Sequence, residues 1–232
     1  MEVRMNSKQR CAKVAQSLIK EGMIVGLGGG QTIQYLIEEI KEKNRNLKIV
    51  TPSAKTAMLC VQKGMDVVPL QWIHSLDMAF DGCDEMDAQF CALKSGGGIH
   101  TLEKITASMA KEYILMVDET KYAQTLKYTH PIVLEVLPEA YSFICERLKE
   151  LNFIFSYRQT NKKDGFLFSE HGNVLIDVYL SSYIDPKTLY DLLKSITGVV
   201  EVSLFVKEVT GILLAREDKV EFLKKVNSAC MI

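Results

Sequence analysis

The chain has 232 residues, which allows one large domain or two smaller ones, and its 47% apolar and 25% charged residues are typical of a globular chain with a buried core. Its 28 basic and 29 acidic residues leave a net charge of −1, so no overall attraction for nucleic acid is expected. The longest apolar runs, around 113–117 and 153–155, are far shorter than the about 18 residues of a membrane span, and no secretory signal is visible. These features predict a cytoplasmic protein without a membrane or nucleic-acid partner.

Cysteines and histidines are scattered along the chain, with no CxxC pair and no histidines four residues apart. A chain of this length has enough core to fold without disulfides, so free thiols are expected. The spacing does not match a structural zinc site, and no metal is expected. The residues concerned are Cys11, Cys60, Cys83, Cys91, Cys145 and Cys230, with His74, His100, His130 and His171.

The first half of the chain alternates predicted helices and strands. A helix that Ser7 can cap ends at Gly22, and further helices are expected at 31–42, 53–63 and 102–111. Strands are expected at 23–27, 47–50, 66–70, 78–80 and 113–117. This rhythm predicts an α/β fold with a doubly wound, mostly parallel, Rossmann-like sheet, in which functional sites lie beyond the carboxyl ends of the strands.

The pattern changes near residue 130. Strands are expected at 131–137, 152–158, 165–168, 174–179 and 198–205, and helices at 139–151 and 185–195. Two successive βαβ units of this kind suit a smaller ferredoxin-like α+β domain. The tail at 211–225 is expected to add a strand and a helix. The predicted domains are therefore a Rossmann-like catalytic domain, 1–129 with 205–232, and a ferredoxin-like domain, 130–204.

A glycine-rich loop, GLGGGQT, follows the first predicted strand over residues 26–32. Glycines at a strand-to-helix turn let backbone N–H groups approach an anion, and the following helix N-terminus favours negative charge. The loop lacks the last glycine of a GxGxxG motif and has no Walker lysine. Two interpretations of this loop are equally open: a phosphate-binding loop and a tight turn without a ligand.

An acidic loop, DGCDEMD, follows the predicted strand at 78–80 and holds four carboxylates in seven residues. Gly82 lets the chain turn, so that Asp84 can point back toward Asp81. Clustered carboxylates perform acid–base chemistry or bind a divalent cation, and the alternative is a solvated acidic turn.

A third loop, KSGGG at 94–98, is followed by Glu103 at a predicted helix start. A lysine beside a flexible glycine run can neutralise an oxyanion while backbone amides hold it. Glu103 also has an alternative interpretation, because a glutamate in a first helical turn interacts favourably with the helix dipole.

Taken together, these loops resemble those of a known family. The stretch from DMAFDGCDEMD through KSGGGIHTLEK to VDETKY, residues 77–122, closely resembles the signature of type A ribose-5-phosphate isomerases. So do GLGGG-T near residue 26 and, in the second half, HPIVLEVLP, YRQ, GNVLIDV and ITGVVEVSLF. The resemblance spans nearly the whole chain.

This resemblance implies an isomerase that interconverts ribose 5-phosphate and ribulose 5-phosphate in the non-oxidative pentose phosphate pathway, without a metal or an organic cofactor. Glu103 matches the general base, which would move a proton between C2 and C1 through an enediolate. Asp81 and Asp84 would bind sugar hydroxyls and assist ring opening, and Lys94 would stabilise the enediolate oxygen. A homodimer or homotetramer is also implied.

The resemblance further implies a set of substrate-binding positions, among which Lys8 would reach the phosphate. The set is Lys8, Gly29, Gly30, Gln31, Thr32, Gly82, Cys83, Ser95, Gly96, Gly97 and Lys121.

The chain departs from the family pattern chiefly where phosphate would bind. The family's glycine turn usually reads GTGST, whereas residues 28–32 read GGGQT, so that only the hydroxyl of Thr32 remains. Lys55 could compensate in part. Leu102 stands where arginine is common, and Ser95 stands where glycine is common. Two alternatives therefore stay open: an isomerase of another phosphorylated sugar, and a non-catalytic regulatory paralogue that binds a sugar phosphate.

Overall fold

The computed structural model describes residues 5–43, 46–160 and 164–225 and divides the chain into two compact units. Unit 1 comprises 1–83, 105–122 and 207–232, and unit 2 comprises 84–104 and 123–206. The domain division expected from the sequence stays a prediction. It differs from the compact units mainly at 84–104, which it assigned to the first domain.

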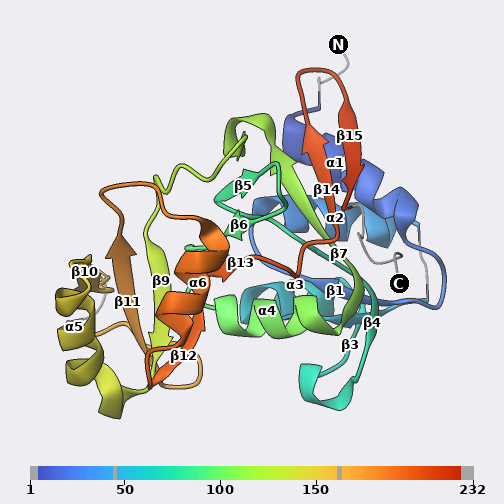
Figure 1. Ribbon diagram of the computed structural model, residues 1–232. Helices are drawn as coiled ribbons and strands as arrows, with labels where there is room; N and C mark the ends of the chain where they lie inside the picture. The colour runs from blue at the N-terminus through green and yellow to red at the C-terminus, as the bar shows by residue number, and fades with distance from the viewer. Residues whose placement is uncertain (1–4, 44–45, 161–163, 226–232) are drawn as a thin grey trace, which may run out of the picture. The chain divides into compact units, whose positions relative to one another are not determined.

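Unit 1 is built on a seven-stranded sheet with the strand order β15-β14-β7-β4-β1-β2-β3 (Figure 1). All neighbours are parallel except the antiparallel pair of β14 and β15, which confirms the predicted mostly parallel sheet. The strands are β1 (Ile24–Leu27), β2 (Lys48–Val50), β3 (Asp66–Val67), β4 (Leu76–Asp81), β7 (Ala110–Asp118), β14 (Gly211–Ala215) and β15 (Val220–Lys224).

Two of the three α-helices of unit 1 start at side-chain caps. The N-cap of the first helix is Asn6 rather than the expected Ser7, because Asn6 and Gln9 form a reciprocal capping box. Ser53 caps the third helix. The helices are α1 (Ser7–Leu18), α2 (Gln31–Glu42) and α3 (Ala54–Gln62), with single turns η1 (Leu70–Trp72) and η2 (Glu119–Lys121). Their apolar faces share one core with the sheet, including Ala15, Ile37 and Phe80.

The prediction of a helix in the tail is wrong. Residues Val220–Lys224 form β15, which pairs with β14 as a hairpin. The turn is closed by the N–H of Arg216, which donates to the carbonyl of Lys219 at 2.9 Å. Pairing with β14, which is already part of the sheet, stabilises this short segment more than helix formation would. In the pair, Phe222 lies opposite Leu213.

Unit 2 contains a four-stranded antiparallel sheet with the order β10-β11-β9-β12. Its strands are β9 (Ile132–Val136), β10 (Ile154–Tyr157), β11 (Val174–Tyr179) and β12 (Val199–Val202). Helix α5 (Tyr141–Glu150), preceded by η3 (Pro138–Ala140), and helix α6 (Pro186–Lys194) complete two βαβ units, which confirms the ferredoxin-like prediction. The strand expected at 165–168 is wrong, because only one isolated bridge, from Phe168 to Val174, forms there.

A further small sheet has the order β13-β6-β5-β8. Its strands are β5 (Glu85–Asp87), β6 (Ala92–Leu93), β8 (Tyr122–Ala123) and β13 (Leu204–Phe205), and helix α4 (His100–Met109) follows the glycine loop after β6. Strands of two or three residues carry no readable periodicity, which is why β5 and β6 were expected only as loop.

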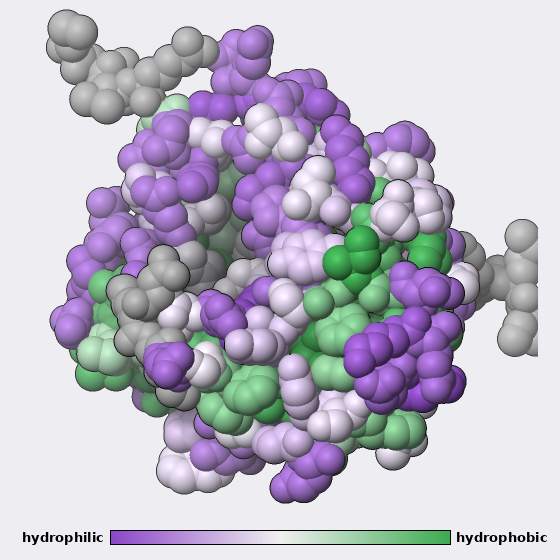
Figure 2. All heavy atoms as spheres, turned by 90° about the vertical axis from the view of Figure 1, so that its left-hand side faces the viewer, coloured by the Kyte–Doolittle hydropathy of each residue, from purple (hydrophilic) through white to green (hydrophobic). Residues whose placement is uncertain are grey.

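The cysteines that the structure describes form no disulfide. Cys11, Cys60, Cys83, Cys91 and Cys145 are free, as expected, and Cys230 lies outside the described residues. Within the described part of the chain, every helix is too short or too polar to cross a membrane. Figure 2 shows apolar side chains among hydrophilic ones on one face; in unit 2, Leu137, Phe143 and Ile154 are exposed.

Candidate active site

Asp81 ends strand β4 of unit 1 and is only 2% exposed. Its Oδ1 accepts hydrogen bonds from the N–H groups of Gly82 at 2.8 Å and Gly29 at 3.3 Å. The hydroxyl of Tyr113 donates to its Oδ2 at 3.3 Å. Gly28 makes this arrangement possible, because a Cβ there would lie 2.0 Å from Oδ1 of Asp81. The acidic loop and the glycine loop therefore meet at this carboxylate.

A cavity of about 40 Å³ lies in unit 1 beyond the carboxyl ends of the parallel strands. Thr32 comes shortly after β1, Gly82 directly after β4, and Lys121 shortly after β7, so the cavity lies where the topology places functional sites. Its lining consists of Ser7, Lys8, Cys11, Thr32, Gly82, Met116, Val117, Asp118 and Lys121.

Two ammonium groups and one carboxylate give this cavity its charge. Burial raises the pKa of Asp118, but hydrogen bonds from Ser7 and Thr120 and the charge of Lys121 outweigh that effect and hold the pKa below its usual value. Asp118 is therefore ionised at neutral pH, and the two lysines leave a net positive charge. Such a cavity favours an anion.

Each lysine of the cavity is held by an uncharged oxygen. Nζ of Lys8 donates to Oε1 of Gln31 at 2.8 Å, and Nζ of Lys121 donates to the carbonyl of Cys83 at 2.6 Å. Gly30, at the N-cap of α2 with φ +89°, provides no side-chain cap, so the first-turn N–H groups of this helix are left for other partners.

Lys55 lines a different cavity of unit 1. This cavity has a volume of about 510 Å³ and is lined in part by Gly30, Ser53 and Thr56. The hydroxyl of Thr56 donates to the carbonyl of Gly28 at 2.8 Å, which ties the start of α3 to the glycine loop. Lys55 is absent from the lining of the smaller cavity that contains Lys8 and Lys121.

In unit 2, Lys94 and Glu103 form a buried ion pair. Nζ of Lys94 lies 3.3 Å from Oε1 of Glu103, and each residue is 5% exposed. Lys94 follows directly after β6, and Glu103 lies in the first turn of α4. Removing an ion pair from water costs desolvation free energy, which the attraction between the two opposite charges offsets.

The first turn of α4 is anchored beside Glu103 by Lys104. This buried ammonium donates to three oxygens near β12 and β13: Oε1 of Glu201 at 2.9 Å, the carbonyl of Val202 at 2.7 Å and the carbonyl of Leu204 at 2.7 Å. These three hydrogen bonds attach the start of α4 to the segment that contains β12 and β13.

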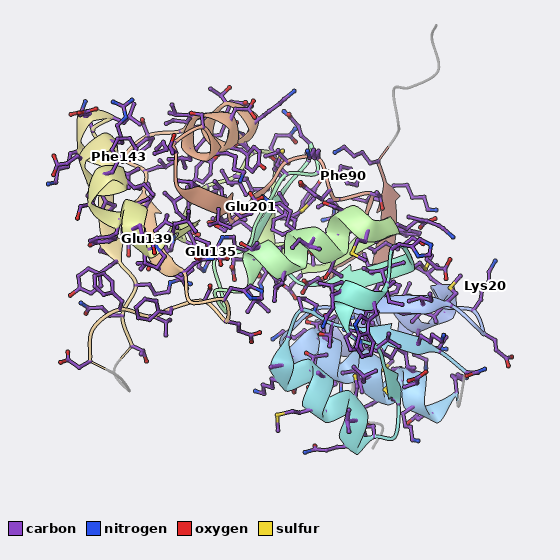
Figure 3. All side chains as sticks on the ribbon, turned by 90° about the horizontal axis from the view of Figure 1, so that it is seen from below. Lys20, Phe90, Glu135, Glu139, Phe143 and Glu201 are labelled. Carbon is purple, nitrogen blue, oxygen red and sulfur yellow. The ribbon has the colours of Figure 1, made fainter. Side chains whose placement is uncertain are left out.

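Two further residues of this turn face a buried carboxylate and carbonyl. The hydroxyl of Thr101 donates to Glu135, and Nε2 of His100 lies 3.3 Å from the carbonyl of Glu201. Figure 3 shows Glu135 and Glu201 beside the beginning of α4. His100 is fully buried, and burial lowers its pKa to about 4 despite the opposing charges of Glu135 and Glu201.

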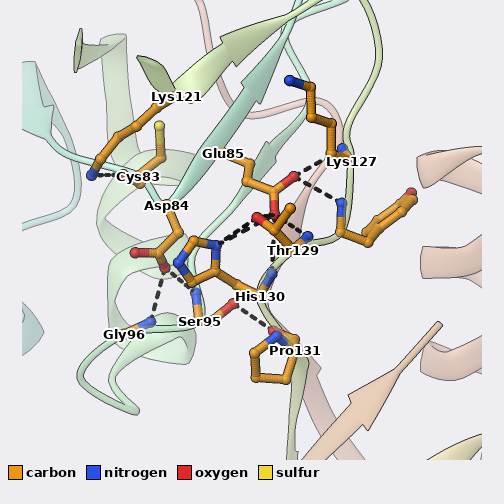
Figure 4. A network of polar contacts seen from close by, with 11 residues as sticks. Cys83, Asp84, Glu85, Ser95, Gly96, Lys121, Lys127, Thr129, His130 and Pro131 are labelled. Atoms are coloured by element: carbon orange, nitrogen blue, oxygen red, sulfur yellow. Dashed lines mark hydrogen bonds and ion pairs between the residues drawn. The ribbon is translucent and has the colours of Figure 1, made fainter. Parts of the chain in front are cut away.

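Asp84 holds the glycine loop of unit 2. Its Oδ2 accepts hydrogen bonds from the N–H groups of Ser95 at 2.6 Å and Gly96 at 3.0 Å (Figure 4). Gly98 requires glycine, because φ is +67° and a Cβ there would lie 2.6 Å from Cδ1 of Leu175. The loop next to Lys94 is therefore shaped by Asp84 and by glycine.

Glu85, the neighbour of Asp84, is a site residue that the sequence did not single out. Its buried carboxylate accepts hydrogen bonds from a nest of donors (Figure 4): the N–H groups of Lys127, Tyr128, Thr129 and His130 and the hydroxyl of Thr129. Burial raises its pKa, but these hydrogen bonds outweigh that effect, and the pKa lies below its usual value. Glu85 thus orders the segment whose Pro131 carbonyl accepts from the Ser95 hydroxyl.

The positions predicted from the sequence thus form two groups. Unit 1 holds Lys8, Gly29, Gly30, Gln31, Thr32, Asp81, Gly82, Cys83 and Lys121, and unit 2 holds Asp84, Lys94, Ser95, Gly96, Gly97 and Glu103. The sequence analysis did not single out Tyr113, Glu85 and Lys104, whose partners lie far away in the sequence. It also did not single out Asp118, which lines the cavity of unit 1. Among the described residues, His, Cys, Asp and Glu form no group of three suited to a metal ion.

Sequence comparisons identify relatives over nearly the whole length of the chain. The family model of ribose 5-phosphate isomerase A (phosphoriboisomerase A) matches residues 48–219, and that of the DeoR C terminal sensor domain matches 3–70. Ribose-5-phosphate isomerase A of Methanococcus aeolicus is 38% identical over 230 residues, which cover 97% of each chain. The enzyme of Prochlorococcus marinus subsp. pastoris is 34% identical and covers 93% of this chain and 96% of its own.

Solved structures give the same assignment. Ribose 5-phosphate isomerase A from Methanocaldococcus jannaschii is 34% identical with a TM-score of 0.87, covering 94% of this chain and 98% of that one. A D-ribose-5-phosphate isomerase in complex with phospho-erythronic acid is 30% identical with a TM-score of 0.89, covering 95% and 100%. The fold, the order of the site loops and these full-length matches agree, and the chain belongs to the ribose 5-phosphate isomerase A family.

Proposed function

We propose that this protein interconverts D-ribose 5-phosphate and D-ribulose 5-phosphate through an enediolate. The observation that carries the proposal is the buried pair of Lys94 and Glu103, whose charged atoms lie 3.3 Å apart. An aldose–ketose isomerisation needs a base beside a group that stabilises an oxyanion, and this pair supplies both. The full-length relatives do not favour the two alternatives, another phosphorylated sugar or a non-catalytic regulator.

Glu103 is the proposed base. Its carboxylate takes the proton from C2 of the open-chain aldose, the C–H electron pair becomes the C1–C2 double bond of the enediolate, and O1 takes up the negative charge. The same carboxyl group then returns a proton to C1, while the hydroxyl proton moves from O2 to O1. The products are a ketone at C2 and a hydroxyl at C1, with no net loss of electrons.

Lys94 is the proposed electrophile, and its ion pair explains how charge moves during the step. When Glu103 accepts the C2 proton its carboxyl becomes neutral, and at that moment the enediolate oxygen becomes negative. The ammonium of Lys94 thus exchanges one negative partner for another and stays paired throughout. Such a preorganised charge requires little rearrangement in the transition state.

Asp81 and Asp84 are the proposed ligands of the sugar hydroxyls, with assistance to ring opening. Each carboxylate is already oriented by two backbone N–H groups, those of Gly29 and Gly82 for Asp81 and those of Ser95 and Gly96 for Asp84. Carboxylates held in this way accept hydroxyl hydrogen bonds without first having to be ordered.

The phosphate is proposed to bind at the positively charged cavity of Lys8, Thr32 and Lys121 in unit 1. The α2 N-terminus beside it favours a dianion. A relative was solved with phospho-erythronic acid, which carries a phosphate at one end and an acid group at the other. We expect this compound to compete with ribose 5-phosphate here, because its carboxylate places negative charge as an enediolate does.

The remaining positions complete the proposed site. Gly29, Gly30, Gln31, Gly82, Cys83, Ser95, Gly96 and Gly97 are assigned to substrate binding through their loops, with no metal and no cofactor. A cytoplasmic homodimer or homotetramer is also proposed, and the exposed Leu137, Phe143 and Ile154 of unit 2 offer apolar surface for such an assembly.

Turnover of ribose 5-phosphate by the purified protein in the presence of EDTA tests the proposal. We expect activity that EDTA leaves unchanged and that Glu103→Gln reduces by about 10³-fold or more, because an amide cannot accept the C2 proton. Glu139→Gln, at an exposed position of unit 2, serves as the matched control and should retain full activity. Loss of activity in EDTA, or a Glu103→Gln variant as active as the wild type, contradicts the proposal.

A further inference from the structure

The glutamine of the altered glycine turn, Gln31, has an unexpected partner. Its Oε1 accepts a hydrogen bond from Nζ of Lys8 at 2.8 Å, across 23 positions of sequence. Its amide nitrogen lies 3.5 Å from the hydroxyl of Tyr35, one helical turn further along α2. The side chain of Gln31 is thus directed toward Lys8.

Lys8 lines the cavity, but its long side chain can adopt many conformations unless a contact holds its ammonium group. The capping box of Asn6 and Gln9 sets the start of α1 and hence the direction in which Lys8 leaves the helix. Beyond the backbone, the lysine stem has four rotatable bonds, and ordering them costs about 1.5–2 kcal/mol. The hydrogen bond to Gln31 orders the ammonium before any ligand arrives.

Gln31 is absent from the lining of the cavity, whereas Lys8 lines it together with Thr32 and Lys121. Gln31 therefore acts on the cavity through Lys8 rather than through a contact of its own. Its acceptor is neutral, so Lys8 keeps its full charge for an anion. The Cys83 carbonyl holds Lys121 in the same manner, at 2.6 Å.

We propose that Gln31 is a positioning residue that holds the Lys8 ammonium at the phosphate-binding cavity and so replaces the hydroxyl contacts missing from this glycine turn. The inference rests on the proposed function, because it takes the substrate's phosphate as the anion. The neutrality of the amide matters, since a carboxylate at this position would pair with Lys8 and repel the phosphate.

The test combines kinetics with a double-mutant cycle. Gln31→Ala should raise KM for ribose 5-phosphate by about 10-fold with kcat within about twofold, because the interaction serves binding of the phosphate equally in ground and transition states. Lys8→Ala should raise KM by about 50-fold. In the Lys8→Ala background, Gln31→Ala should have no further effect.

Two other variants distinguish an effect of Gln31 on Lys8 from a general effect on the structure of α2. Gln31→Glu keeps an acceptor for Lys8 but adds negative charge, so KM should rise more than in Gln31→Ala, with a larger rise at low ionic strength. Gln34→Ala, one turn along the same helix and lining the other cavity, is the matched control and should leave KM and kcat unchanged. An unchanged KM in Gln31→Ala, or a further rise when it is added to Lys8→Ala, overturns the proposal.

A second measurement tests the role of Gln31 in phosphate binding independently of turnover. Inorganic phosphate should raise the unfolding temperature of the wild type and of Gln34→Ala, and a higher concentration should be needed for the same shift in Gln31→Ala. If the wild type shows that pattern but does not turn over ribose 5-phosphate, the proposed reaction fails and the role of Gln31 stands. If phosphate stabilises the wild type and Gln31→Ala equally, the role of Gln31 fails even where turnover is observed.

Discussion

At the scale of single residues, Asp81 depends on glycine as its neighbour. The strand β4 delivers its carboxylate against the turn that follows β1, and the two approach so closely that a methyl group at Gly28 would lie 2.0 Å from Oδ1. Gly29, one position further, has no atom nearer than 3.8 Å to the same imagined methyl group. Close packing therefore requires glycine at position 28 but not at position 29.

This contrast predicts that two matched substitutions differ in their effect on stability. Gly28→Ala should lower the free energy of unfolding by about 1–3 kcal/mol, because Asp81 or its strand must move to admit the methyl group. Gly29→Ala should change it by less than about 0.5 kcal/mol, since the space is open and φ is not in the left-handed region. Urea unfolding of both variants checks this. Equal stability of the two would show that the close approach to Asp81 is relieved at no cost.

At the scale of elements, the first turn of α4 is the part on which the proposed chemistry depends most. Lys104 and Thr101 connect it to Glu201 and Glu135, and these contacts fix the turn from which Glu103 projects. His100 lies in the same turn, fully buried and with its Nδ1 lacking a hydrogen-bond partner among the described residues. The groups around it are Glu135, Glu201 and Lys104.

This burial predicts a pH dependence of stability. Burial lowers the pKa of His100 from 6.5 to about 4, so the folded state disfavours its protonated form. Stability is therefore fully present above pH 6.5 and declines as the pH falls toward 4, because only the unfolded chain binds the proton readily. The contribution is on the order of 3 kcal/mol.

Urea unfolding between pH 7 and pH 5 provides the measurement. His100→Leu should show a flatter dependence over this range than the wild type, whereas His171→Leu, at an exposed position, should keep the wild-type slope. A His100→Leu variant with the same slope as the wild type would mean that this histidine already binds its proton in the folded state.

At the scale of the whole molecule, local patterns predicted the architecture but not the contacts that complete the site. Apolar periodicity indicated the parallel sheet of unit 1 and the ferredoxin-like order of unit 2, and both are confirmed. The tail strand β15 was missed because its conformation is decided by pairing with β14 rather than by its own five residues. The carboxylate loop was recognised and Asp84 was singled out in it, but Glu85 was not, because its donors lie 42–45 positions away in the sequence.

The same limit applies to the phosphate region. The sequence shows that hydroxyls are missing from the turn, but only the packing of α1 beside α2 brings Lys8 to Gln31. Side-chain pairs that join distant segments carry no signal in a single sequence. Motifs with fixed local geometry, such as the glycine loop after β6, could be recognised, because their backbone conformation alone restricts which residue types fit.

The central claim is that Glu103 removes the proton from C2 of the sugar. Proton NMR of ribose 5-phosphate in D2O measures this directly, since an enediolate formed by a carboxylate base takes up solvent deuterium at C1 of the product and at C2 of the recovered substrate. The wild type should catalyse this exchange, and folded Glu103→Gln should lose both exchange and turnover together. Exchange or turnover at the wild-type rate in folded Glu103→Gln would contradict the account.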